Sequence, residues 1–122
     1  LVGKDMFKET KYLDPIEIAQ DMSRILKTEE QCDLIICLSH LGYDYENQQK
    51  VSDRSLARST KDIDLIIGGH THTFLDEPTL ETNTIGKSVL INQVGCYGLY
   101  VGKVDFYLEP KGTFFSSQSL RV

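Results

Sequence analysis

The sequence predicts an α/β fold. Two short, mainly apolar runs, residues 34–38 and 63–67, lack the length of a helix and the alternation of a half-exposed strand. We therefore expect two buried strands covered on both faces. A segment with helical spacing precedes each run, and β-rich segments follow after Pro78. The order helix, strand, helix, strand is typical of parallel neighbours joined by a right-handed crossover.

The first helix is predicted over residues 15–27. Asp14 has the short acidic side chain that caps a helix N-terminus, and Pro15 fits the first helical position. Apolar side chains then recur with helical spacing at Ile16, Ala19, Met22, Ile25 and Leu26.

The remaining elements are shorter. The polar residues 39–49 predict a loop, and Ser52 predicts the start of a second helix over residues 52–59. Strands are predicted at residues 89–91, 99–108 and 113–122, with a turn at residues 111–112.

Composition excludes some classes of function. The chain has 122 residues, enough for one domain, and its net charge of -5 argues against a nucleic-acid partner. No apolar run approaches the ~20 residues of a membrane span. Three cysteines without a CxxC motif predict free, packed thiols. The start at Leu1, without Met or a signal-like segment, leads us to expect a chain cut from a longer protein.

All the histidines follow the predicted buried strands. His40 comes after the first strand, and His70 and His72 come after the second, in Gly-Gly-His-Thr-His-Thr. Because parallel strands end at the same edge of a sheet, we expect His40 and His70 on one rim. Imidazole is a common metal ligand, and two metals together clamp a phosphoryl group. Because His70 and His72 are two residues apart on an expected extended turn, their side chains can diverge toward two adjacent metals.

Other polar residues near these strands have less defined roles. Ser39 and Thr71 are expected either to donate hydrogen bonds behind the metal ligands or to stabilise only a local turn. Asp64 lies at the other end of its strand, so no catalytic role is expected. Surface or turn roles are expected for Asn83, Asn92 and Gln93, with contact to a ligand as the alternative.

Residues 38–42, Leu-Ser-His-Leu-Gly, and residues 66–73, Ile-Ile-Gly-Gly-His-Thr-His-Thr, resemble the last two signature blocks of the calcineurin-like metallophosphoesterases. The similarity is closer to the 5'-nucleotidase branch, which includes UDP-sugar hydrolases and 2',3'-cyclic-nucleotide phosphodiesterases. It extends over most of the chain, including residues 14–15, 52–57 and 95–102.

The resemblance implies a four-layer α/β sandwich with two divalent metal ions, which are Zn, Mn, Co, Ni or Fe. It implies that His40 and His70 bind one ion and that His72 binds the other. It also implies that a metal-bridging hydroxide attacks a nucleotide or related phosphoester. A periplasmic, cell-surface or extracellular location is typical of this branch.

The earlier family blocks, Asp-x-His, Gly-Asp-x-x-Asp and Gly-Asn-His-Asp/Glu, do not occur here. The family's C-terminal nucleotide-binding domain is also missing. We therefore expect residues 1–122 to form the C-terminal half of a catalytic domain, incomplete and inactive without its N-terminal half. Strands that lose their neighbours expose an apolar edge, so self-association is expected.

Two other functions remain open. A short natural chain of this kind would use the same histidines to bind one structural or regulatory Zn²⁺. An unrelated protein would keep the fold for protein contacts, and would then be indifferent to substitution of the histidines. Upstream Asp-x-His and Gly-Asn-His blocks would favour the enzyme.

Overall fold

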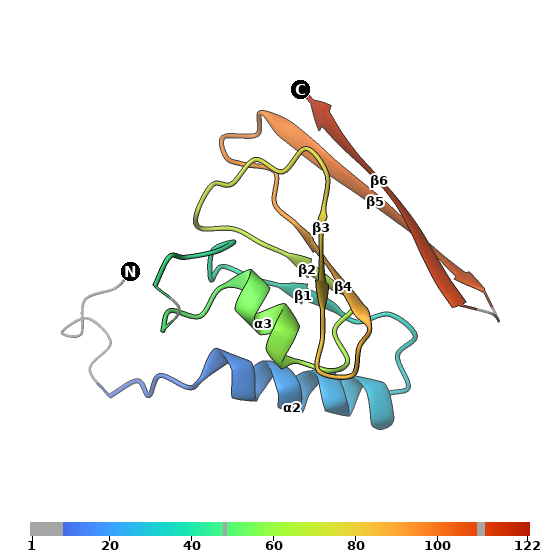
Figure 1. Ribbon diagram of the computed structural model, residues 1–122. Helices are drawn as coiled ribbons and strands as arrows, with labels where there is room; N and C mark the ends of the chain where they lie inside the picture. The colour runs from blue at the N-terminus through green and yellow to red at the C-terminus, as the bar shows by residue number, and fades with distance from the viewer. Residues whose placement is uncertain (1–8, 48, 110–111) are drawn as a thin grey trace.

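A computed structural model describes residues 9–47, 49–109 and 112–122. The elements occur in the order α2 (Pro15–Thr28), β1 (Ile36–Leu38), α3 (Asp53–Ser59), β2 (Leu65–Ile67), β3 (Thr79–Thr82), β4 (Ser88–Asn92), β5 (Tyr100–Glu109) and β6 (Gly112–Arg121). Four strands form a sheet in the order β1-β2-β4-β3, and β5 and β6 form a hairpin. Helices α2 and α3 lie on one side of the four-stranded sheet and the hairpin lies on the other (Figure 1).

The sheet has the predicted mixture of parallel and antiparallel strands. β1 pairs in parallel with β2, with Cys37 opposite Ile66, and β2 pairs in parallel with β4. β3 pairs with β4 in the antiparallel direction. The prediction of βαβ units followed by antiparallel strands is therefore confirmed.

Both predicted helices form with the expected caps. Asp14 Oδ1 accepts hydrogen bonds from the backbone N–H groups of Ile16 and Glu17, at 2.8 and 3.1 Å. These bonds satisfy donors that have no partner inside the helix. Ser52 caps α3 in the same way, and Ser55 completes a capping box by bonding back to the Ser52 backbone.

The core lies between the helices and one face of the sheet. Leu56 and Ala57 of α3 are buried against Ile66 of β2 and Ile91 of β4. From α2, Ile16, Ala19 and Leu26 pack against this cluster. These contacts fix α3, and the loop that precedes it, over the ends of β1 and β2.

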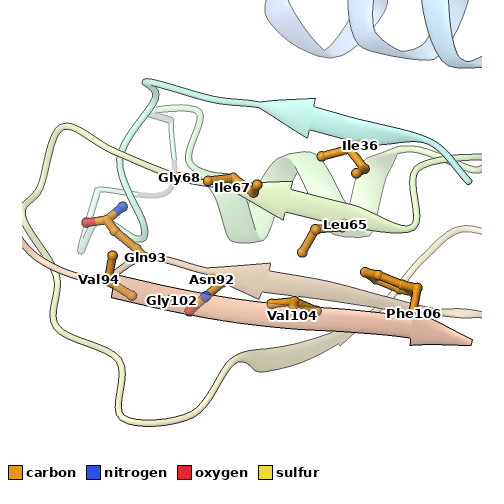
Figure 2. Close-up of a pocket in the computed structure, with 10 residues that line it drawn as sticks. All are labelled: Ile36, Leu65, Ile67, Gly68, Asn92, Gln93, Val94, Gly102, Val104 and Phe106. Carbon is orange, nitrogen blue, oxygen red and sulfur yellow. The ribbon is translucent and has the colours of Figure 1, made fainter. Parts of the chain in front are cut away.

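The prediction that both parallel strands are covered on both faces is confirmed for Leu65 and Ile66 of β2, which are 3% and 0% exposed, but is wrong for β1 and for the end of β2. Ile36 and Leu38 of β1 are 46% and 81% exposed, and Ile67 of β2 is 45% exposed. The helices cover only one face, and β1 is an edge strand. The other face borders a groove of about 290 Å³ beneath β5, in which Ile36 and Leu65 face Val104 and Phe106 (Figure 2).

Other sequence-based expectations can also be compared with the structure. β3 was not predicted, because its sequence, Thr-Leu-Glu-Thr, carries little apolar character. The predicted turn at residues 111–112 falls partly outside the described residues. All three cysteines are free, as predicted. None of the described helices has the length and apolar character needed to cross a membrane.

Candidate metal centre

Two of the three histidines lie together at the ends of the parallel strands. His40 follows β1 and His70 follows β2, and these strands are paired residue for residue. The His40 and His70 ring centroids are 5.2 Å apart and the rings are inclined by 70°. This separation lets both imidazoles reach one metal ion with ligand bonds of about 2.0–2.1 Å.

His72 lies beside a different ring. Its centroid is 6.1 Å from that of Tyr97, which is 88% exposed. The backbone of His70 and His72 is left-handed, with φ of 74° and 53°, so the predicted extended turn is wrong. Residues other than glycine adopt this backbone conformation at a cost in free energy. The conformation persists where surrounding contacts impose it. The chain thus turns sharply at each histidine.

Gln93, directly after β4, holds this turn through hydrogen bonds of its side-chain amide. Its side-chain oxygen accepts hydrogen bonds from Thr73 N at 2.5 Å and from the Thr71 hydroxyl at 3.1 Å. Its amide nitrogen donates to Gly69 O at 2.9 Å. Gln93 is 2% exposed, so the expected surface role is wrong, and the role in a turn is confirmed by these hydrogen bonds. The polar side chain of Gln93 gives no indication in the sequence that this residue is buried.

Asp53, the first residue of α3, holds the His40 turn. The Ser39 hydroxyl donates to Asp53 Oδ1 and accepts a hydrogen bond from Leu41 N at 3.2 Å. The Asp53 backbone N–H also donates to Gly42 O at 2.8 Å. Sequence reasoning missed Asp53, since an acidic residue after a serine cap is an ordinary helix start.

Ser39 and Thr71 therefore bond to residues far away in the chain. Ser39 reaches Asp53, and Thr71 both donates to Gln93 and accepts from Tyr43 N at 2.9 Å. The bond from Tyr43 joins the His40 turn to the His70–His72 turn. Asn83 stabilises a distant turn, and Asn92 lies in the groove beneath β5.

Two pKa shifts describe the electrostatics of this edge. The pKa of His70 is lowered mainly by partial loss of hydration. The neighbouring His40 ring and the Lys50 ammonium lower this pKa further. The His70 ring is therefore held in the neutral form that binds metals. Burial raises the pKa of Asp53. This effect is larger than the opposite effects of the hydrogen bond from Ser39 and the charge of His40, which both lower the pKa. The buried Oδ2 atom of Asp53 has no hydrogen-bond partner in the part of the chain that the structure describes.

An open pocket of about 500 Å³ borders the histidine pair. The Lys50 ammonium lies 3.6 Å from the Tyr45 ring centroid on its wall. The pocket therefore presents two imidazoles and one cation to an approaching anion. Its lining is Tyr12, Asp14, His40, Leu41, Tyr45, Gln49, Lys50, Val51 and His70.

The donor set fits part of a metal shell. Two imidazoles converge at His40 and His70, but within the described ranges no three His, Cys, Asp or Glu side chains gather closely enough to hold an ion. A stable metal site commonly has four or more ligands. The arrangement thus needs oxygen or nitrogen donors beyond those two rings.

The chain is similar to proteins that are named for phosphate-ester hydrolysis. It is 34% identical over 112 residues to the trifunctional nucleotide phosphoesterase protein YfkN of Bacillus subtilis, across 92% of this chain and 7% of the relative. It is 37% identical over 112 residues to an apyrase of Tabanus yao, across 80% of this chain and 19% of the relative. The chain thus spans under a fifth of either relative. No protein-family profile matches it.

Among solved structures, a 5'-nucleotidase precursor from Thermus thermophilus superposes with a TM-score of 0.76 and 32% identity. The match covers 89% of this chain and 23% of that one. The predicted fold, in which parallel strands are followed by antiparallel ones, is thus that of a segment within a larger α/β architecture.

Proposed function

Since this chain belongs to the 5'-nucleotidases and related metallophosphoesterases, we propose that it supplies part of the dinuclear metal centre of a phosphohydrolase. The substrate class is a nucleotide or a related phosphoester, as for a 5'-nucleotidase, a UDP-sugar hydrolase or a cyclic phosphodiesterase. The observation that carries the proposal is the pair of imidazoles, His40 and His70, at the ends of two parallel strands.

In this proposal His40 and His70 hold one divalent ion and His72 holds the other. The separation of the first two rings and the different surroundings of His72 support this division. Such ions, when bound, stabilise phosphoryl charge and acidify water. The residues of this chain orient the ligands, because hydrogen bonds to Gln93 hold the turn that carries His70 and His72.

We assign residues 1–122 to the C-terminal half of the catalytic domain. The remaining donors would come from an N-terminal half that covers the exposed face of β1 and β2. The small share of each relative that this chain spans supports the assignment, as does the absence of a three-donor cluster among the described residues. The chain alone is then inactive or nearly so. A periplasmic, cell-surface or extracellular location follows from the family resemblance.

Metal binding tests the ligand assignment. We expect the chain to bind Zn²⁺ weakly in a competition titration, and His40→Ala and His70→Ala each to lower the affinity at least about tenfold. His72→Ala is the matched control, because His72 is assigned to the second ion. Its loss should leave the Zn²⁺ affinity of the His40–His70 position unchanged. Equal losses for all three variants would contradict the division into two ions.

Hydrolysis tests the assignment to half a domain. Wild-type chain with Mn²⁺ or Zn²⁺ should show no turnover of a nucleoside monophosphate, a UDP-sugar or a cyclic nucleotide above that of His40→Ala and His70→Ala. Turnover that both substitutions abolish would show that this chain carries a complete site. A single tightly held Zn²⁺ without turnover would favour a structural zinc module.

A further inference from the structure

We propose that Gln93 is a positioning residue, whose side-chain amide holds the His70–Thr71–His72 turn in the shape that binds metal. The proposal rests on the proposed function of these histidines and deepens it. Gln93 itself touches neither metal nor substrate. It acts through three hydrogen bonds to the turn.

The bonds of Gln93 enclose the turn from both ends. Gly69 O, just before His70, accepts from the amide nitrogen at 2.9 Å. Thr73 N, just after His72, donates to the amide oxygen at 2.5 Å, and the Thr71 hydroxyl between them donates to the same oxygen. Only a group that both donates and accepts satisfies all three partners.

Gln93 is itself rigidly placed. It is 2% exposed, and its backbone carbonyl accepts from Leu75 N at 3.1 Å. The adjacent Asn92 carbonyl accepts from Gly68 N at 2.9 Å, which ties the end of β4 to the end of β2. Figure 2 shows Gln93 and Gly68 together at one end of the groove beneath β5.

The turn needs such support because of its backbone. His70 and His72 both have positive φ, in a chain where an unsupported histidine would relax to a negative φ. Thr71 also accepts from Tyr43 N, so the support from Gln93 extends to the turn that carries His40. Loss of the amide should therefore loosen the His70–His72 turn and its alignment with His40.

Asn83 provides a matched control. It is also a buried amide, 7% exposed, with three side-chain hydrogen bonds. Its nitrogen donates to Lys61 O, and its oxygen accepts from Ile85 N and Lys87 N. None of these partners belongs to a histidine-bearing turn. Asn83→Leu therefore removes the same chemistry without touching the proposed site.

The test compares Gln93→Met, Gln93→Glu and Asn83→Leu in the full 122-residue chain. The first readout is the ¹⁵N order parameters of residues 69–73 without metal, and the second is Zn²⁺ affinity. Gln93→Met should lower the order parameters from about 0.85 toward 0.6 and weaken Zn²⁺ binding roughly 10–100-fold. Gln93→Glu keeps both acceptor contacts but sets a carboxylate oxygen against Gly69 O, so it should also lower the order parameters and weaken Zn²⁺ binding.

Asn83→Leu should change neither readout, even where it lowers the melting temperature as much as Gln93→Met does. Unchanged order parameters and affinity in Gln93→Met would overturn the proposal, and so would equal changes in Asn83→Leu. If Gln93→Met does not fold, Gln93→Glu decides by the same criteria. If wild-type chain binds no Zn²⁺, the proposed function fails, and the order parameters alone decide whether Gln93 holds the turn.

Discussion

Gly68 lies where the two buried polar side chains beneath the histidines meet. A Cβ atom placed on it would lie 2.1 Å from Asp53 Oδ2 and 3.0 Å from Gln93 Nε2. Atoms do not approach so closely without displacement, and neither side chain is exposed. Glycine is therefore required here for space rather than for its backbone angles.

We expect Gly68→Ala to lower the free energy of unfolding by about 1–3 kcal/mol, because the new methyl group must displace the Asp53 carboxylate. Urea unfolding followed by circular dichroism measures the loss. The control is the double variant Gly68→Ala with Asp53→Ala, whose cost should be less than the sum of the single costs. Additive costs would mean that this contact is not the cause.

The sequence singled out the histidines of the candidate site, with Ser39 and Thr71 beside them, but not the supporting roles of Asp53 and Gln93. His40, His70 and His72 follow apolar runs directly, so local pattern and parallel pairing suffice to place them. Asp53 and Gln93 become buried only because α3, β2 and β4 converge at one point. That convergence is a tertiary contact and leaves no trace in local spacing.

At the scale of elements, α2 depends on Asp14, the capping residue that directly precedes it. Asp14→Ala removes the acceptor for two backbone N–H groups, and we expect a loss of about 1 kcal/mol in the free energy of unfolding. Thermal or urea unfolding detects this change. Asp14→Asn keeps an acceptor and should stay within a few tenths of a kcal/mol of wild type. An equal loss in both variants would exclude the cap as the cause.

Helix α3 is tied to β3 by an ion-pair network. Glu81 accepts hydrogen bonds from Arg58 and Arg54, at 2.8 and 2.5 Å, and its side chain is 10% exposed. The hydrogen bond from Arg58 is the main cause that lowers the pKa of Glu81 from its usual 4.5. A lowered pKa in the folded state means that this stabilisation is present above pH 4.5 and is lost as the pH falls further.

Glu81→Gln should therefore cost roughly 1–2 kcal/mol in the free energy of unfolding at pH 7, and progressively less as the pH falls below 4.5. Urea unfolding across this pH range measures the difference from wild type. Glu29→Gln is the control, since the exposed Arg24–Glu29 pair at 3.6 Å should contribute almost nothing. A cost that does not vary with pH would rule out the ion pairs.

Elements with local signals were predicted well, and those without them were not. The caps at Asp14 and Ser52 mark α2 and α3 within the chain itself. β3 carries polar residues and becomes a strand only because β4 offers it a free edge. The burial of β1 was overestimated, because an apolar run does not say whether a second layer covers it.

At the scale of the whole molecule, the apolar side chains that stay exposed on β1 and at the end of β2 should govern behaviour in solution. Leu38, Ile36 and Ile67 are all substantially exposed, and among the described residues β1 pairs with β2 alone. Exposed apolar edge strands pair readily with other chains. The chain on its own should therefore self-associate.

Light scattering over a concentration series tests this expectation. Leu38→Lys should shift the chain toward monomer, since a charge on an edge strand opposes pairing. Met22→Lys is the matched control, because Met22 is 51% exposed on α2 and lies away from that edge. A monomeric wild-type chain at high concentration would contradict the expectation.

The β5–β6 hairpin has a consequence for how the strands of this chain come to pair during folding. Within the described residues β5 pairs with β6 alone, in unbroken register from Tyr100 opposite Arg121 to Glu109 opposite Gly112. These contacts are close in sequence, so they cost little loop-closure entropy and form within microseconds. β1, β2 and β4 must instead wait for distant segments to meet. On refolding from denaturant, the hairpin would thus pair first, while the histidine-bearing edge is still being assembled.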